Sequence, residues 1–237
     1  MRELLYEGKA KRLYKTEDEE SLLVQYKNDA TAFNGLKKAT IDGKGRLNNE
    51  ITSLLFSKLQ ENGIPSHFIK KLSDTEQLVK KVEIIPLEVV VRNVAAGSLA
   101  KRLEIEEGRV LTQPIVEFYL KNDDLGDPLV TKSHILELQV ATAEELKELR
   151  KKGLEVNQFL KSFFAELGIN LIDFKLEFGK DTEGNILLAD EISPDTCRLW
   201  DCQTNEKLDK DVFRRDLGSL TAAYEKILEK LGGHQHV

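Results

Sequence analysis

The sequence predicts an α+β protein of two lobes. Short apolar runs with a glycine turn open the chain, which is typical of antiparallel strands, and segments with helical spacing follow. A further apolar run over Ile84–Val91, broken by Pro86 and Glu88, leads into the second half of the chain. We therefore place a seam near Glu83–Pro86, with one lobe over residues 1–85 and the other over residues 86–237. Ligand clefts tend to lie at such seams.

The N-terminal half contains strands and one amphipathic helix. Leu4–Tyr6 and a run ending at Tyr14 flank Gly8, and Leu22–Tyr26 is predicted to form another short strand. Asn48–Asn62 carries apolar residues at helical spacing and stops at a glycine, as expected for a helix with a C-terminal glycine cap.

The C-terminal half contains the longest helical signal and a hairpin. Thr142–Leu167 opens with a Thr-x-x-Glu capping box and keeps helical spacing to its end. Leu171–Phe178 and Ile186–Ile192 are predicted to pair as a β-hairpin around the turn-rich KDTEGN. A final helix is expected over Asp216–Leu231, and the last residues, GGHQHV, are expected to form a loose tail whose histidines bind no metal.

Composition limits the classes of protein. The 237 residues are 41% hydrophobic and 32% charged, which gives ample apolar material for a core. A formal net charge of −6 argues against broad nucleic-acid binding. The chain has neither an apolar run of the length that spans a bilayer nor an N-terminal signal sequence, so no membrane partner is expected. Two cysteines outside a C-x-x-C spacing favour the reducing cytoplasm.

The first candidate for chemistry is EGKAKRLY, residues 7–14. A glycine between strands lets backbone amides approach phosphate oxygens, and Lys9 and Lys11 would point to the same face of a strand. Two ammonium groups could then converge on a polyphosphate. The alternative is a solvated hairpin with surface lysines, since the spacing of a Walker loop is absent.

The second candidate is LIDFKLEFG followed by ILLADEISPDTCRLWD. Strict alternation puts Asp173, Lys175 and Glu177 on one strand face. A turn centred between residues 182 and 183 would set Lys175 opposite Asp190, with Glu177 one diagonal away. Two carboxylates from adjacent strands, together with water and phosphate oxygens, suit Mg²⁺. The alternative is a water-facing hairpin, and a register shift of one residue would move Asp190 to the other face.

Two arginines near these motifs could hold a phosphate group. Arg198 follows the hairpin in a turn rich in polar groups, where it suits bidentate recognition of phosphate or carboxylate. In IIPLEVVVRNVAAGS, Arg92 ends an apolar run and is followed by Gly97 and Ser98. The guanidinium group, a backbone amide and the serine hydroxyl could together bind a monophosphate. The alternatives are a surface ion pair for Arg198 and a simple strand end for Arg92.

Together and in this order, the motifs resemble the SAICAR synthetase family. The similarity runs from about Leu4 to Leu231 and includes NDATAFNG, DGKGRLNNE and LSDTEQLVKK between the motifs. It implies a kinase-like N-lobe with an antiparallel sheet that binds the nucleotide. It also implies an ATP-grasp-like C-lobe that binds substrate and metal, with the nucleotide site in the cleft between the lobes.

The resemblance implies an ATP- and Mg²⁺-dependent ligase of de novo purine biosynthesis. Such an enzyme condenses 5-amino-1-(5-phosphoribosyl)imidazole-4-carboxylate (CAIR) with L-aspartate. The small-molecule partners would be CAIR, L-aspartate and ATP, and a cytoplasmic homo-oligomer is expected, with a dimer favoured.

The resemblance also implies roles for individual residues. The ATP-binding residues would be Lys9, Ala10, Lys11, Lys81, Val82, Ile84 and Lys121. The Mg²⁺ ligands would be Glu177 and Asp190. The ribonucleotide would be bound by Arg92, Ser98, Lys175, Asp195 and Arg198, with Asp211 and Arg214 as further contributors.

The chemistry of amide formation fits these roles. A carboxylate must be activated before an amine can attack it, because oxide is too poor a leaving group. ATP would phosphorylate the carboxylate and the amine of aspartate would attack the acyl phosphate, so the protein would contribute mainly positioning and charge neutralisation.

A small-molecule kinase with the same Mg·ATP site is the alternative, and it would need only one acceptor. A non-catalytic nucleotide-binding module would bind ATP without turnover.

Overall fold

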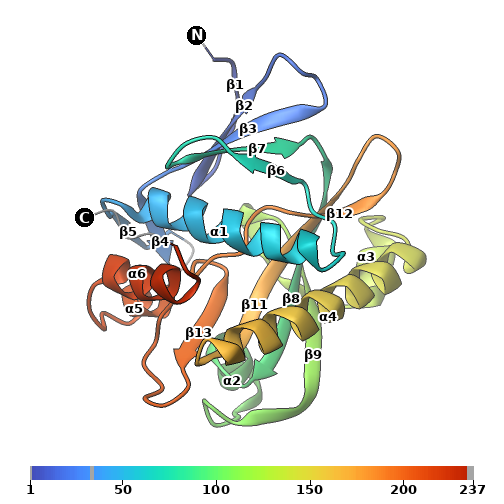
Figure 1. Ribbon diagram of the computed structural model, residues 1–237. Coiled ribbons are helices and arrows are strands. Elements are labelled where there is room, and N and C mark those ends of the chain that lie inside the picture. The colour runs from blue at the N-terminus through green and yellow to red at the C-terminus, as the bar shows by residue number, and fades with distance from the viewer. Residues whose placement is uncertain (1, 33–34, 234–237) are drawn as a thin grey trace.

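The computed structural model describes residues 2–32 and 35–233 and has two lobes of α+β architecture (Figure 1). The N-lobe is built on an antiparallel sheet in the order β1-β2-β3-β7-β6. The C-lobe is built on a second antiparallel sheet in the order β10-β9-β8-β11-β12, with β13 also paired to β11. The predicted fold class is therefore confirmed. None of the helices in the two described ranges has the length and apolar character that crossing a membrane requires.

The elements have the following bounds. The N-lobe sheet contains β1 (Leu4–Glu7), β2 (Lys11–Lys15), β3 (Ser21–Tyr26), β6 (Phe68–Lys71) and β7 (Glu76–Lys80). The strand pair β4 (Asp29–Ala32) and β5 (Lys37–Thr40) precedes helix α1 (Lys44–Glu61). The C-lobe strands are β8 (Glu83–Val94), β9 (Val110–Leu120), β10 (Leu129–Val130), β11 (Ile169–Lys180), β12 (Ile186–Ala189) and β13 (Cys197–Asp201). Its helices are α2 (Gly97–Leu103), the 3₁₀ turn η1 (Asp123–Leu125), α3 (Lys132–Glu137), α4 (Ala143–Glu166), α5 (Asp211–Arg214) and α6 (Leu220–Lys230).

The long helix α4 begins as its sequence predicts. The Thr142 hydroxyl accepts a hydrogen bond from the Glu145 backbone N–H at 3.2 Å, and the Glu145 carboxylate accepts one from the Thr142 N–H at 2.7 Å. This reciprocal capping box satisfies two backbone donors that would otherwise lack partners.

Two other helix boundaries differ from the prediction. Helix α1 begins at Lys44, earlier than expected, directly after Gly43 with φ +80°. Helix α6 begins at Leu220, later than expected, because Asp216 and Gly218 have φ values of +54° and +140° that a right-handed helix cannot contain. The histidines of the C-terminal tail lie outside the described residues.

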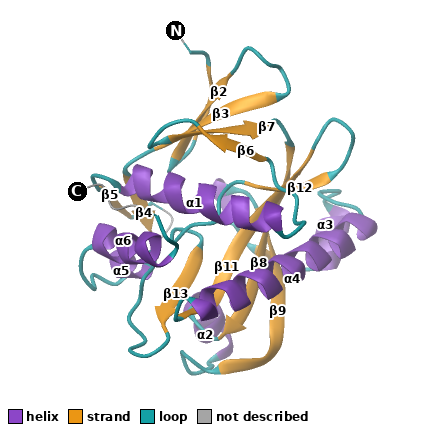
Figure 2. Cartoon of the chain, viewed as in Figure 1, coloured by secondary structure: helices purple, strands orange, loops and turns teal. Residues whose placement is uncertain are grey.

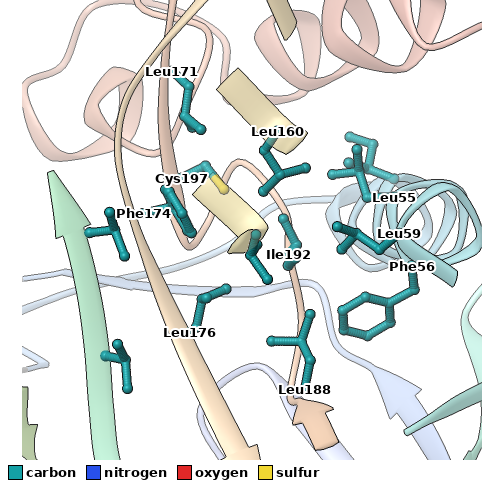
Figure 3. Packing of buried hydrophobic residues seen from close by; sticks show 14 of the residues in the cluster. Leu55, Phe56, Leu59, Leu160, Leu171, Phe174, Leu176, Leu188, Ile192 and Cys197 are labelled. Atoms are coloured by element: carbon teal, nitrogen blue, oxygen red, sulfur yellow. The ribbon is translucent and has the colours of Figure 1, made fainter. Parts of the chain in front are cut away.

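Helix α1 joins the two lobes. It lies beneath the N-lobe sheet and beside α6 (Figure 1). Leu55, Phe56 and Leu59 on α1 belong to the same buried cluster as Leu160 of α4 and Leu188 of β12 (Figure 3). Helix α1 therefore contributes its apolar face to the core of the C-lobe, although it precedes the seam in sequence.

Strand β11 is the centre of the C-lobe. It pairs with β8 on one side and with β12 and β13 on the other, and α4 lies across β8, β9 and β11 (Figure 2). Gly153 of α4 allows this close approach, because a Cβ there would lie 3.3 Å from Val89 and 3.4 Å from Val91. The sheet face beneath α4 is thus apolar, and the opposite face is available for polar groups.

His67, just before β6, is a buried titratable group in the core. It is 5% exposed, its ring packs edge-on against Phe56 with centroids 5.6 Å apart, and its Nε2 has no hydrogen-bond partner among the described residues. Burial lowers the pKa of His67 from 6.5 to about 4. The folded state therefore binds fewer protons at His67 than the unfolded state between these two pH values.

From this pKa shift we predict that acid destabilises the protein through His67. The free energy of unfolding should fall by about 1–3 kcal/mol as the pH drops from about 6.5 to about 4, in addition to any loss from other groups. In His67→Gln, which cannot titrate, this part of the slope should disappear. Denaturant unfolding at several pH values measures it, and equal slopes for the two proteins would contradict the prediction.

Candidate active site

The polar face of the C-lobe sheet carries a row of charged side chains. Asp173, Lys175 and Glu177 follow one another along β11 on the face opposite α4. Asp173 pairs with Arg92 of β8, and Glu177 pairs with Glu88 of the same strand. Asp173 and Glu177 are each 3% exposed, so this face is buried and is not the water-facing side of a hairpin.

Lys175 is the centre of what we call the lysine–carboxylate network, which comprises Lys11, Glu88, Lys121, Lys175, Glu177 and Asp190. The Nζ atom of Lys175 lies 2.6 Å from Glu177 Oε1 and 3.2 Å from Glu88 Oε1. The same nitrogen is 3.7 Å from Asp190 Oδ2. One ammonium group therefore holds three carboxylates of the C-lobe close together.

Two further lysines reach the network from other elements. Lys121, which follows β9, donates a hydrogen bond to Glu177 Oε1 at 3.1 Å. Lys11 of β2 donates one to Asp190 Oδ1 and lies 3.6 Å from Glu191 Oε1. Because Lys11 belongs to the N-lobe sheet and its partners to the C-lobe, the network connects the two lobes.

The hairpin that carries Asp190 has a different register from the predicted one. Glu177 pairs with Ala189, so a regular strand would place Asp190 beside Leu176 and on the opposite face. Strand β12 ends at Ala189, however, and Asp190 has φ +59°. This left-handed backbone redirects the carboxylate toward Lys175. The predicted register is wrong by one residue, whereas the predicted proximity of Lys175 and Asp190 is confirmed.

Opposite charges in the network favour the ionised forms of Asp190 and Lys175. Burial alone would raise the pKa of Asp190, but Lys11 and Lys175 outweigh it and hold this pKa below its ordinary value. Burial would lower the pKa of Lys175, but Glu177 and Asp190 raise it well above its ordinary value. Burial raises the pKa of Glu88 in spite of Lys175. Such charges act strongly on a bound anion, because water screens them little.

Lys9 does not lie beside Lys11 as predicted. It lies in the turn before β2, where its Nζ pairs with Asp123 Oδ1 of the C-lobe at 2.7 Å. The strand alternation that would align the two lysines begins only at Lys11. Ala10 accepts a backbone hydrogen bond from Lys27 at 2.7 Å, which fixes the end of this turn against β3.

A second group, the arginine chain, continues the polar face from Asp173. Arg92 Nη1 donates to Asp173 Oδ2 at 2.8 Å, and Arg198 Nη1 donates to both oxygens of Asp173 at 3.1 and 3.0 Å. Arg198 Nε donates to Asp211 Oδ2 at 2.9 Å, and Arg214 Nη1 donates to Asp211 Oδ1 at 2.7 Å. Three guanidinium groups thus alternate with two carboxylates.

Arg92 and Arg198, the two arginines that bond to Asp173, differ in the donors that they leave available. Arg92 Nε donates to Glu117 at 2.8 Å, and its Nη2 donates to the Ser98 hydroxyl at 3.0 Å and to the Tyr119 hydroxyl at 3.1 Å. Arg198 Nη2 takes part in none of the hydrogen bonds made by the described residues, and it faces Gly97. Arg198 and Ser98 therefore offer more free donors to a phosphate than Arg92 does.

Asp195 lies in a third group with Lys44, Lys210 and Tyr224, which we call the Asp195 cluster. Lys44 Nζ donates to Asp195 Oδ2 at 2.6 Å, and the Tyr224 hydroxyl donates to Oδ1. Lys210 Nζ is 3.7 Å from Oδ2. Burial would raise the pKa of Asp195, but Lys210 and Lys44 outweigh it and hold this pKa below its ordinary value.

Three of the residues expected to bind ATP lie at the seam. Lys81, Val82 and Ile84 lie where β7 ends and β8 begins, and Val82 packs closely against Gly179 of β11. A cavity of about 660 Å³ also opens at the seam. Its lining, which includes Glu20, Lys81, Glu148, Lys152 and Asp181, places it on the side of α4, away from the lysine–carboxylate network.

Several residues of these groups are absent from the predicted site. Asp173 alternates with apolar residues in the same way as Lys175 and Glu177, and Glu88 is a charged residue within the apolar run before Arg92. The strand pattern could therefore have indicated that Asp173 and Glu88 belong to the site. Lys44 gives no such signal, because a lysine at the start of a helix is ordinarily solvent-exposed. Its full burial becomes visible only from the contact of α1 with residues 190–195.

This fold and these groups define a two-lobed enzyme that acts on phosphorylated, anionic ligands. The family model of SAICAR synthetase matches residues 4–231. A phosphoribosylaminoimidazole-succinocarboxamide synthase from Bacillus cytotoxicus is 69% identical over 235 residues, 99% of this chain and 98% of the relative. The chain therefore belongs to the SAICAR synthetase family.

Solved structures agree with this membership. A phosphoribosylaminoimidazole-succinocarboxamide synthase from Ehrlichia chaffeensis is 48% identical with a TM-score of 0.96, over 99% of this chain and 100% of that one. A SAICAR synthetase in complex with ADP is 50% identical with a TM-score of 0.95, over 99% of this chain and 100% of that one.

The contact between Gly97 and Arg198 gives a testable prediction. Gly97 has φ +53°, and a Cβ there would lie 2.5 Å from Arg198 Nη2. Gly97→Ala should displace this guanidinium and raise KM for the ribonucleotide about tenfold or more, with little change in KM for ATP. Gly184→Ala is the control, because Gly184 also has a positive φ but open space at its Cβ. A similar effect of both substitutions, measured by steady-state kinetics, would assign the loss to backbone strain alone.

Proposed function

We propose that the chain joins the carboxylate of CAIR to the amine of L-aspartate, with conversion of ATP to ADP and phosphate. Membership of the SAICAR synthetase family over residues 4–231 supports this choice of substrates. The relative in complex with ADP supports ATP as the nucleotide. In this chain, the observation that carries the chemistry is the lysine–carboxylate network between the lobes, with Lys175 at its centre.

The reaction would have two steps. An oxygen of the CAIR carboxylate attacks the γ-phosphorus of ATP, which releases ADP and forms an acyl phosphate. The neutral amine of aspartate then attacks the acyl carbon, the C–O bond to phosphate breaks, and the nitrogen loses a proton as the amide forms. Lys9, Lys11 and Lys121 would offset the phosphate charge, and Lys175 would orient the substrate carboxylate.

The network also supports a Mg²⁺ site at Glu177 and Asp190. Carboxylate oxygens are the donors that Mg²⁺ prefers, and two protein ligands leave room for water and phosphate oxygens. Among the described residues, no group of three or more His, Cys, Asp or Glu side chains is arranged to hold a metal. Glu177 and Asp190 are both paired with Lys175, so Lys175 would release at least one of these carboxylates to hold such an ion. Bound there, Mg²⁺ would neutralise charge on the phosphates.

The remaining predicted residues would bind either the ribonucleotide or the nucleotide. Arg92, Ser98 and Arg198 would hold the 5′-phosphate of the ribonucleotide, with Asp211 and Arg214 behind them. Asp195 and Lys175 would lie at its imidazole end. Ala10 and the residues Lys81, Val82 and Ile84 would contact the nucleotide.

The two lobes would divide the binding of nucleotide and substrate between them. The nucleotide-binding lobe would cover residues 1–85 and the substrate- and metal-binding lobe residues 86–237, with α1 as the shared element. We also propose that the chain forms a homodimer in the cytoplasm. Light scattering of the purified protein tests the dimer.

A coupled assay of ADP and phosphate tests the substrate assignment. Both products should form only when ATP, CAIR, L-aspartate and Mg²⁺ are all present, because the acyl phosphate is consumed by the amine. Formation of ADP at the full rate without aspartate would instead indicate a small-molecule kinase, and binding of ATP without any turnover would indicate a nucleotide-binding module.

The metal assignment predicts the effect of removing either carboxylate. Glu177→Gln and Asp190→Asn should each lower kcat about 100-fold or more at saturating Mg²⁺, because the charge on the transferring phosphoryl group is then less compensated. Glu183→Gln is the control, since it makes the same change in the exposed hairpin turn. Normal kcat in folded Glu177→Gln or Asp190→Asn protein would contradict the assignment.

A further inference from the structure

Lys11 has two carboxylates within reach but a hydrogen bond to only one of them. Its Nζ atom donates to Asp190 Oδ1, whereas Glu191 Oε1 lies 3.6 Å away, which is beyond hydrogen-bond distance. The Lys11 and Glu191 side chains are 15% and 5% exposed, so water stabilises neither charge well. A shift of the ammonium group by about 1 Å would bring it within hydrogen-bond distance of Glu191.

The Glu191 carboxylate is itself held in place. The Ser193 hydroxyl donates to Glu191 Oε2 at 3.3 Å and accepts the backbone N–H of Asp195 at 3.0 Å. Among the residues that the structure describes, none donates a hydrogen bond to Oε1, the oxygen nearer to Lys11. Glu191 therefore offers Lys11 one fixed and available acceptor.

The Tyr26 ring contacts the same ammonium group from the N-lobe. Tyr26 of β3 lies directly opposite Lys11 of β2, and Lys11 Nζ is 5.6 Å from the centre of the ring. The Tyr26 hydroxyl accepts a hydrogen bond from Gln77 Nε2 at 3.0 Å, and Tyr26 and Gln77 are both buried. A ring fixed in this way attracts the ammonium group whichever carboxylate it bonds.

The proposed metal site gives Asp190 a second use. A carboxylate that holds another cation is a poorer acceptor for a lysine, so Lys11 would lose its only hydrogen-bonded carboxylate while the nucleotide is bound. A buried ammonium group that loses its partner costs free energy. Glu191 is not among the proposed metal ligands, and it remains available to Lys11 at this stage.

We propose that Glu191 and Tyr26 are positioning residues for Lys11, which keep its ammonium group beside the phosphates of the nucleotide when Asp190 holds another cation. This inference rests on the proposed function, which places those phosphates at Lys11. Neither residue needs to touch a ligand, because both act through Lys11. The lysine then exchanges one carboxylate for its neighbour in sequence and keeps its place between the lobes.

Binding of ADP without metal, measured by calorimetry, tests this role in a double-mutant cycle. Asp190→Asn imitates the occupied carboxylate, because it removes the charge that holds Lys11, and asparagine tolerates the same backbone conformation. In this variant the addition of Glu191→Gln should weaken ADP binding about 10-fold or more. In the otherwise unchanged protein, where Asp190 still holds Lys11, Glu191→Gln should weaken it by less than about threefold. Lys11→Met gives the loss expected when the ammonium group is absent.

Substitutions of Tyr26 test the contribution of the ring. Tyr26→Phe keeps the ring and should leave ADP binding within about twofold, whereas Tyr26→Leu should weaken it about 3- to 10-fold, as expected for the loss of a cation–π contact. Tyr14→Leu is the control, because Tyr14 belongs to the same strand as Lys11 but lies on its opposite face. If Glu191→Gln does not fold, Tyr26→Leu compared with Tyr26→Phe in the Asp190→Asn protein provides the test.

Two results would overturn the proposal. An equal loss of ADP affinity from Glu191→Gln in the unchanged and the Asp190→Asn protein would show that Glu191 does not replace Asp190 as the partner of Lys11. No loss in either protein would show that Lys11 does not use Glu191. Failure of the proposed function is distinguishable from both, because Lys11→Met would then leave ADP binding unchanged, or the unchanged protein would show no turnover that depends on aspartate.

Discussion

The placement of β11 between β8 and β13 is the constraint on which the site depends. One face of this strand lies beneath α4 and is apolar, while the other carries Asp173, Lys175 and Glu177. Burial of each large apolar side chain contributes about 1.5–3 kcal/mol. Buried charges, in contrast, cost free energy unless they are paired. The apolar face therefore provides the stability that lets the opposite face hold so many charges out of water.

The lobes are less independent than their separate sheets suggest. Helix α1 precedes the seam in sequence, yet its apolar residues belong to the core of the C-lobe, and Lys44 at its start pairs with Asp195. The lysine–carboxylate network also connects the lobes, through Lys11. A shared core opposes wide separation of the lobes.

Local sequence patterns predicted the elements better than their boundaries and pairing. The capping box of α4 and the alternation along β11 are local, and both are present. The predicted hairpin register was wrong because the turn between Lys180 and Ile186 is centred on residue 183. The proximity of Asp190 to Lys175 depends instead on a bend at Asp190 that no pattern of polar and apolar residues encodes. The burial of Lys44 and the meeting of Arg92 with Arg198 at Asp173 depend on contacts between distant segments. The resemblance to a family supplied the substrates, which spacing alone could not.

The left-handed backbone at Asp190 matters to anyone who wishes to transplant this chemistry. A designer who copied Glu177 and Asp190 onto an ideal hairpin would preserve both residue types and their separation in sequence. The two carboxylates would nevertheless point to opposite faces, because the observed pairing of Glu177 with Ala189 sets them out of phase. Aspartate tolerates this backbone conformation better than most residues, so one side chain can both make the bend and use it. The smallest transferable unit is therefore the hairpin together with its irregular end.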